Sequence, residues 1–460
     1  MKTYIFCLLT FMFSYVSFSQ NSKEDNLKTA FKKEKNSTKA FLRLLNLGEY
    51  YKEHNIFRAD SLKHVILQKS NDLDEIYRFK ALLYSAEIAE IQGNQDEYFR
   101  GILALQPFLD QTNSREVQYE IYRHLGFYYS SALDFEKAKQ YLNIALKLAK
   151  KSRNNTQIAE TYSSIAFNFM ISNKKDSSFY YTDEAIQYAR RSANKSVLAE
   201  SFNTQAQIYA YFGQIELSVA KNFVSLALVS GVNDLPKMAK YSREIGQSQL
   251  QISNLIQAEK YFKLSIEYSQ EIFDQRQVAL GWSNLGTVYK ERKDYDRAIE
   301  FNQKAITSLT ELNDYNGLGE AYNNLGVIYR ELHKYELAAH NFNKALVHYE
   351  STNNRERIAG VYHNVGTVFL QQKRYLIALN YLKRSIEIRK QFGSKNQIFY
   401  TYRIISDVYS EIGKSKESLK YMHMYLDFLD SNTSVQESAK IAELSELYRS
   451  EQRERLIAMQ

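Results

Sequence analysis

The sequence predicts an all-α protein built as a tandem array of helix hairpins. Glycine recurs every 40 residues at Gly246, Gly286, Gly326 and Gly366, and Gly126 lies three such steps before Gly246. Self-similarity with a period of about 20–50 residues is typical of a solenoid, in which each unit buries its apolar face only against its neighbours. Such arrays commonly act as binding surfaces, and the repeats alone do not identify what they bind.

Other residues recur in register with these glycines. Three units begin with WSNLGTVY, YNNLGVIY and YHNVGTVF, at Trp282, Tyr322 and Tyr362. Each unit continues with a second block, which reads YDRAIEFNQKAI, YELAAHNFNKAL or YLIALNYLKRSI. Small residues hold two fixed positions in these second blocks, namely Ala298, Ala338 and Ala378, followed by Ala305, Ala345 and Ser385. Two blocks per unit predict two antiparallel helices.

The pattern resembles the tetratricopeptide repeat, whose consensus is W-x2-L-G-x2-Y…A-x3-F…P. The best unit matches it at Trp282, Leu285, Gly286, Tyr289, Ala298 and Ala305. The resemblance implies a right-handed superhelical solenoid of helix hairpins. The commonest repeat of the family has about 34 residues and a closing proline, which this chain lacks. The 40-residue unit is therefore similar to the longer variety found in kinesin light chains, LGN-type spindle adaptors and Rap regulators of Gram-positive bacteria, and it implies longer helices or turns.

The small residues are expected where helices cross closely. Interaxial distances of about 8–10 Å leave little room for a side chain at positions such as Gly326 and Ala338. Tyr322, Leu325 and Tyr329 have i, i+3, i+7 spacing, so they should form the buried stripe of a first helix.

The same phase extends beyond the clear units. Small residues keep it where glycine is absent, at Ala86, Ala166, Ala206 and Ser406. Leu47, Gly48 and Tyr51 begin another unit two residues out of phase. We therefore expect about ten hairpins over residues 41–430, with atypical terminal units. No linker composition interrupts this span, which predicts a single elongated domain.

Residues 1–19 are predicted to be a secretory signal peptide. Lys2 precedes the apolar run YIFCLLTFMFSYVSF, and Ser17 and Ser19 stand at the −3 and −1 positions of a cleavage site. The run is too short for a transmembrane anchor. Cys7, the single cysteine, lies within this peptide, so the mature chain would have no disulfide. The expected location is the periplasm or the extracellular medium.

The segments that flank the array differ from it in composition. Residues 20–40 are polar and basic, which predicts a mobile leader. After residue 434 the 40-residue phase ends, and Ile441, Leu444 and Tyr448 share one face of a predicted amphipathic helix over 434–460. This helix would cap the last hairpin or act as a signalling linker.

The C-terminal segment also resembles one in exported tetratricopeptide sensor proteins of Bacteroidota-type bacteria. There it links the repeats to a transmembrane helix and to a histidine-kinase or helix-turn-helix output domain. The resemblance implies a sensor part that lacks its output domain, or an incomplete product of a longer gene.

The sequence predicts no catalytic residues, no cofactor and no metal site. Its eight histidines form no HExxH motif. Gly413-Lys414-Ser415 ends like a phosphate-binding loop, but Val408 stands where that loop needs glycine. A net charge of +8 and a pI near 9.0 do not indicate nucleic acid, because Lys and Arg alternate with Asp and Glu. No apolar run of membrane-spanning length follows residue 20.

The candidate site is the concave surface, which the resemblance assigns to the first helix of each hairpin. Asn284, Asn324 and Asn364 form a ladder of amides that could bind an extended peptide backbone, or could instead bridge adjacent repeats. Basic residues lie beside this ladder, at Arg243, Lys290, Arg330, His363 and Arg403. A mildly basic groove favours an acidic or carboxylate-bearing partner.

Two functions follow from these observations. The first is a non-enzymatic exported scaffold that binds a peptide or protein partner in its concave groove. The alternative is the sensory input region of a two-component or helix-turn-helix signalling protein. The sequence leaves the partner's identity and the oligomeric state open.

Overall fold

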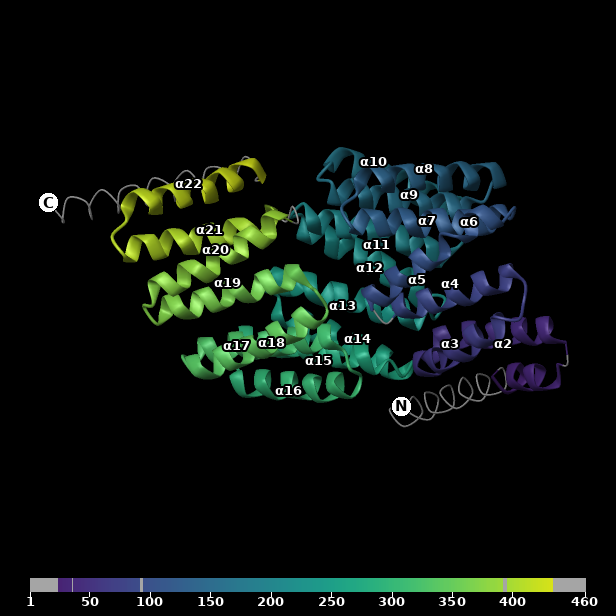
Figure 1. Ribbon diagram of the computed structural model, residues 1–460, viewed down its shortest axis with the longest axis horizontal. Helices are drawn as coiled ribbons and strands as arrows, with labels where there is room; N and C mark the ends of the chain where they lie inside the picture. Colours follow the sequence, from purple (N-terminus) through teal and green to yellow (C-terminus); the bar gives the residue numbers. More distant parts are fainter. Residues whose placement is uncertain (1–23, 35, 92–93, 392–394, 433–460) are drawn as a thin grey trace, which may run out of the picture. The chain divides into compact units, whose positions relative to one another are not determined.

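The structure, a computed structural model, describes residues 24–34, 36–91, 94–391 and 395–432. The predicted signal peptide (1–19) and C-terminal helix (434–460) lie outside these residues. Helices account for all regular secondary structure in the described ranges (Figure 1), and their bounds are α2 (Ser37–His54), α3 (Ile56–Ser70), α4 (Glu75–Ile91), α5 (Gln95–Leu105), α6 (Phe108–Gln111), α7 (Arg115–Ser131), α8 (Phe135–Ser152), α9 (Asn155–Ile171), α10 (Lys175–Arg191), α11 (Lys195–Tyr211), α12 (Ile215–Ser230), α13 (Leu235–Gln251), α14 (Leu255–Glu271), α15 (Gln275–Glu291), α16 (Tyr295–Glu311), α17 (Tyr315–Glu331), α18 (Tyr335–Ser351), α19 (Arg355–Gln371), α20 (Tyr375–Gln391), α21 (Lys395–Glu411) and α22 (Ser415–Asn432).

None of the described helices has both the length and the apolar composition needed to span a membrane.

The predicted all-α hairpin architecture is confirmed. Consecutive helices pack as pairs, such as α9 with α10 and α17 with α18. From α7 onward a helix begins every 20 residues, and most of these helices have 17 residues. A 17-residue helix is about 25 Å long. The 40-residue unit is therefore two long helices and two short turns, so the added length over the commonest repeat lies in the helices.

The described turns from α7 onward share one backbone geometry. A residue with positive φ recurs at 20-residue intervals, and most of these residues are not glycine, for example Leu133 and Lys373. The residue after it is commonly Asp or Asn and caps the next helix: the Asn154 side chain accepts from the N–H of Gln157, and Asp314 accepts from the N–H of Gly317. From α7 onward, the described turns therefore carry a left-handed residue after the helix, and many of the following helices begin at a side-chain cap.

Glycine marks the helix crossing inside several hairpins, as predicted. A Cβ added to Gly326 would lie 2.6 Å from the ring of Phe342, and one added to Gly366 would lie 2.6 Å from Leu382. Gly246 stands in the same relation to Phe262, at 2.7 Å. The residues that replace glycine in this phase are all buried, with at most 1% of their surface exposed: Ala86, Ala166, Ala206 and Ser406.

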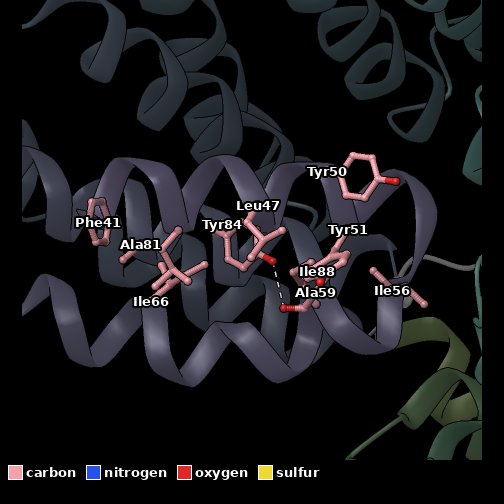
Figure 2. Packing of buried hydrophobic residues seen from close by; sticks show 11 residues of the cluster. Phe41, Leu47, Tyr50, Tyr51, Ile56, Ala59, Ile66, Ala81, Tyr84 and Ile88 are labelled. Atoms are coloured by element: carbon pink, nitrogen blue, oxygen red, sulfur yellow. Dashed lines mark hydrogen bonds between the residues drawn. The ribbon is translucent and has the colours of Figure 1, made fainter. Parts of the chain in front are cut away.

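Aromatic side chains fill the space on either side of these crossings. In the first hairpins, Tyr84 is buried next to Gly48, whose added Cβ would lie 2.8 Å from its ring. The Tyr84 hydroxyl donates a hydrogen bond of 2.9 Å to the carbonyl of Ala59 (Figure 2). Phe41 and Ile66 lie in the same cluster. The polar end of the tyrosine is thus paired while its ring packs in the core.

The described part of the predicted leader differs from expectation. Residues 24–33 are helical, and Leu27 and Phe31 pack against the first hydrophobic cluster. The Tyr51 hydroxyl also donates to Glu24 at 2.8 Å. Leu27 and Phe31 are four residues apart, so they share one helical face, and this apolar contact binds a segment whose composition is otherwise polar.

The described chain divides into two compact units, of which unit 1 ends at Val288 and unit 2 begins at Tyr289, within α15. Unit 1 contains a contact between distant hairpins: the N–H of Ile56 donates to the carbonyl of Ile272 at 2.9 Å, and both side chains are buried. In a solenoid each hairpin ordinarily contacts only its neighbours. In unit 1, the start of α3 therefore also meets the end of α14.

Two glycines of α19 allow a matched stability test. Gly366→Ala should lower the free energy of unfolding by about 1–3 kcal/mol, because its Cβ would overlap Leu382. Gly360→Ala should be neutral or raise it by up to about 1 kcal/mol, since alanine favours helix and the nearest atom would be 4.0 Å away. Denaturant unfolding of both variants measures the difference. Equal stabilities would contradict the assigned crossing.

A second test concerns the buried cap of α15. Burial raises the pKa of Asp274 to about 6, although the N–H of Gln277 and the charges of Arg276 and Arg243 oppose this rise. The folded state then holds the Asp274 proton more tightly than the unfolded state. The stability contributed by Asp274 is present below about pH 4 and is lost, on the order of 1–3 kcal/mol, as the pH rises to about 6.

Asp274→Asn keeps a capping oxygen but removes the titration, so this loss should disappear from unfolding curves recorded between pH 4 and 6. Asp294→Asn is the control, because hydrogen bonds from Arg297 lower the pKa of Asp294 and its pH effect has the opposite sign. An unchanged pH profile for Asp274→Asn would be evidence against this assignment.

Candidate functional site

The first helices of the hairpins lie on the inner side of each unit's curvature. In unit 1, α7 packs on α9 and α9 on α11, and in unit 2, α17 packs on α19 and α19 on α21. Among the described residues, the second helices of successive hairpins do not pack on one another to this extent. Elements that approach each other more closely lie on the inside of a curve. We call the surface formed by the first helices the inner surface.

The inner surface of unit 2 has a hollow of about 400 Å³. It is formed by α19, α20 and α21, and it is lined by His363, Arg389, Tyr400, Arg403, Ile404 and Asp407. The hollow thus brings together two of the residues predicted from the sequence, His363 and Arg403. Arg389 comes from a second helix, and sequence reasoning did not single it out.

A buried hydroxyl fixes the orientation of two lining side chains. Nη1 of Arg389 donates to Oγ1 of Thr401 at 2.9 Å, and Nδ1 of His363 lies 3.0 Å from the same oxygen. Arg389 has no acceptor atom, so Thr401 is the acceptor in that bond and can donate its single hydroxyl hydrogen to Nδ1 of His363. The neutral imidazole then carries its own hydrogen on Nε2, where it can act as a donor.

The electrostatics of the hollow favour a neutral histidine among cations. Burial, followed by the charges of Arg389 and Arg330, lowers the pKa of His363 to about 4. Burial also lowers the pKa of Arg389 and of Arg330, but arginine stays protonated at neutral pH. Burial raises the pKa of Asp407, and the nearby Arg403 opposes that rise. This part of the inner surface is therefore basic.

The predicted amide ladder is distributed between the units. Asn364 donates from Nδ2 to Oδ1 of Asn323 at 2.9 Å, which bridges α19 and α17. Asn324 is partly buried on α17, whereas Asn284 belongs to unit 1. At Asn364, the structure thus shows the inter-repeat bridge that was predicted as the alternative to peptide binding.

Two of the three remaining predicted basic residues, Arg243 and Lys290, have polar partners nearby. Nη1 of Arg243 donates to Oε1 of Gln277 within unit 1. Nζ of Lys290 lies 2.6 Å from a carboxylate oxygen of Glu291. Nε of Arg330 is buried and has no hydrogen-bond partner among the described residues. Of this group, Arg330 lies closest to the hollow, since its charge acts on His363.

Unit 1 has a charged inner surface that sequence reasoning missed. Glu120, Glu160 and Glu200 follow one another at 40-residue steps, and Lys240 takes the next step. Nζ of Lys240 lies 2.9 Å from Glu200, and the Tyr241 hydroxyl donates to the same carboxylate at 2.7 Å. The recurrence of glutamate at the repeat period was the available signal.

These charges compensate one another across hairpins. Burial alone would raise the pKa of Glu200, but Lys240, Lys237 and the Tyr241 hydrogen bond lower it to about 2. Arg123 lies 3.2 Å from Glu120 within α7 and 4.0 Å from Glu160 on α9, in the next hairpin. Unit 1 therefore presents carboxylates held in ion pairs, whereas the hollow of unit 2 presents guanidinium groups.

Comparison with known proteins supports the repeat assignment. The tetratricopeptide-repeat profile matches residues 277–351 and 357–431. The structure is similar to that of a Rap protein complexed with competence and sporulation factor, with 16% sequence identity, a TM-score of 0.53, and coverage of 81% of this chain and 99% of that chain. It is also similar to BtubC (BKLC) from P. vanneervenii, with 20% identity, a TM-score of 0.43, and coverage of 48% and 91%, respectively. No curated protein sequence matches the chain significantly.

The bridge between Asn323 and Asn364 can be measured with a double-mutant cycle. Asn323→Ala and Asn364→Ala should each lower the free energy of unfolding by about 1 kcal/mol, because each leaves an amide without its partner. The double variant should lose less than the sum of the two, since the second change removes a bond already broken. Denaturant unfolding of the four proteins gives the coupling, and additive losses would exclude the bridge.

Proposed function

We propose that this chain, which belongs to the tetratricopeptide-repeat family, is a non-enzymatic scaffold. In this proposal, unit 2 binds a peptide or an extended protein segment along its inner surface. The observation that carries this proposal is the hollow where α19, α20 and α21 present hydrogen-bond donors and guanidinium groups together. Such donors suit the carbonyl groups and carboxylates of an extended chain.

The charge of this surface favours a partner segment with acidic side chains. Arg330, Arg389 and Arg403 are close to His363 or line the hollow with it, and Asp407 is the one carboxylate in its lining. Complementary charge raises association rates and selects partners of opposite sign. The Rap protein of similar fold was solved with a bound factor, which supports a binding role for a solenoid of this kind.

We further propose that the protein meets its partner in the periplasm or outside the cell. The predicted signal peptide at residues 1–19 motivates this part of the proposal. A sensory role, the alternative drawn from residues 434–460, would use the same inner surface to bind its signal.

Charge reversal on the inner surface tests the proposal. Affinity capture from periplasmic extract with the full chain identifies a binding partner, and its dissociation constant is then measured by calorimetry at two salt concentrations. Arg330→Glu combined with Arg403→Glu should weaken binding by at least about tenfold, because two attractive charges become repulsive. Binding to the wild-type protein should weaken as salt rises.

The matched control is Lys304→Glu combined with Arg384→Glu, which changes the net charge equally on exposed positions of the second helices α16 and α20. This control should retain the affinity of the wild-type protein. Equal losses in both double variants, or no loss in the first, would count against binding at the inner surface of unit 2.

A further inference from the structure

Because the hairpins repeat, each position can be compared with the equivalent position of the other hairpins. The α19–α20 hairpin of unit 2 differs from the others at Gly360 and Arg389. At the position of Gly360, the other hairpins from α7 onward have a residue with a side chain. These residues are Glu120, Glu160, Glu200, Lys240, Leu280, Glu320 and Tyr400. At the position of Arg389, six other hairpins have an uncharged buried residue. These residues are Ala149, Ala189, Val229, Ser269, Leu309 and Tyr349.

The two departures meet in space. A Cβ added to Gly360 would have Nη2 of Arg389 as its nearest neighbour, at 4.0 Å. The missing side chain on α19 leaves room on the inner surface, and the guanidinium of α20 reaches that room from a core position. Arg389 is only 7% exposed. Burying a charge is costly, and six other units fill the same position without one, so packing alone does not require arginine there.

The surrounding groups are arranged as donors to an anion. Arg389 donates to the Thr401 hydroxyl, and Arg403 is exposed at the rim. His363 contacts the same hydroxyl through Nδ1, and its Nε2 is a donor when Thr401 donates to Nδ1. Tyr400 and Ile404 provide apolar walls. A volume of about 400 Å³ exceeds that of one small ion and can hold an anionic group together with an apolar body.

We propose that the hollow of unit 2, which we call the Gly360–Arg389 pocket, is a binding site for one carboxylate group attached to an apolar or aromatic body. The site is formed by the convergence of Arg389 and Arg403 with His363. In the bound segment, this carboxylate would belong to an acidic side chain or to the end of the chain, and that part of the inference rests on the proposed function. The binding of a carboxylate by the pocket does not depend on the proposed function.

The charge of the lining favours a carboxylate over a phosphate group. Among the lining side chains, Arg389 and Arg403 are positive, Asp407 is negative and His363 is neutral, which leaves one unit of positive charge. The negative charge of Glu356 also acts on Arg389, which further disfavours a dianion. A carboxylate neutralises it. A phosphate dianion would leave an excess negative charge beside Asp407, at a cost in free energy.

The test uses the full chain with 3-phenylpropionate as the probe and 3-phenylpropanamide as its neutral counterpart. Binding is followed by NMR of the histidine ring protons, with His363 assigned from a His363→Gln variant. The acid should bind at millimolar concentration or tighter and shift the His363 signal, whereas the amide should not.

Bound carboxylate should also raise the pKa of His363, because it stabilises the imidazolium form against the opposing charges of Arg389 on α20 and Arg330 on α17. Arg403 on α21 also lines the pocket. Asp407 on α21 also lines the pocket, but it is there with and without ligand, so the rise in the His363 pKa on binding is due to the ligand.

Variants of the pocket residues locate the site. Arg389→Met should weaken binding of the acid by at least about tenfold, as expected for loss of a charge-assisted hydrogen bond. Gly360→Glu should abolish binding, because it places beside Arg389 the carboxylate that several other hairpins have at this position. Arg403→Gln removes a positive charge at an exposed position. It should also weaken binding of the acid, and it serves as the test if Arg389→Met fails to fold.

Several results would overturn the proposal: equal binding of acid and amide, unchanged affinity in both Arg389→Met and Arg403→Gln, or shifts that leave His363 unaffected. The proposed function fails separately, when the pocket binds 3-phenylpropionate but no peptide or protein segment competes with it. N-acetylphenylalanine and N-acetylglutamic acid α-amide distinguish the sources, because the first offers a chain-end carboxylate and the second a side-chain carboxylate.

Discussion

The close crossing inside each hairpin is the constraint on which the remaining structure depends. At Gly246, Gly326 and Gly366 the second helix lies so near that a methyl group would overlap Phe262, Phe342 or Leu382. Helices that approach this closely can pack along their full 17-residue length. Because the hairpins from α7 onward have similar internal geometry, first helices of neighbouring hairpins, such as α7 and α9 or α19 and α21, come into contact on the inner surface of each unit.

The turns preserve that geometry from one hairpin to the next. A left-handed residue every 20 positions ends each helix, and an Asp or Asn side chain commonly starts the following one. Residues such as Leu133 and Lys373 adopt positive φ at an energetic cost that glycine would avoid. The packing of two long helices offsets that cost, so the turn is imposed by the hairpin rather than by its own residues.

The inner surfaces of the two units use the same framework for different electrostatics. In unit 1, Glu200 accepts from Lys240 and Tyr241, so its charge is matched by neighbours on the next hairpin. In unit 2, Gly360 removes a side chain from this column and Arg389 adds a guanidinium from the second helix. One surface is therefore internally compensated, while the other has an excess of positive charge around a hollow. A regular scaffold can change its binding chemistry through single positions without changing its fold.

The sequence by itself determined the fold class, the repeat period, the crossing residues and the first-helix residues His363 and Arg403, because each is encoded in a spacing along one chain. It also offered binding and bridging as alternatives for Asn364, and the contact with Asn323 appeared only when α17 and α19 were placed side by side. The packing of Leu27 and Phe31 on the first cluster likewise depended on a partner surface that composition does not reveal. Only the tertiary structure decided that Arg389, on a second helix, reaches the inner surface. Spacing identifies which residues share a helix face, but the distance between a guanidinium and a glycine on another helix is set by how closely the two helices cross.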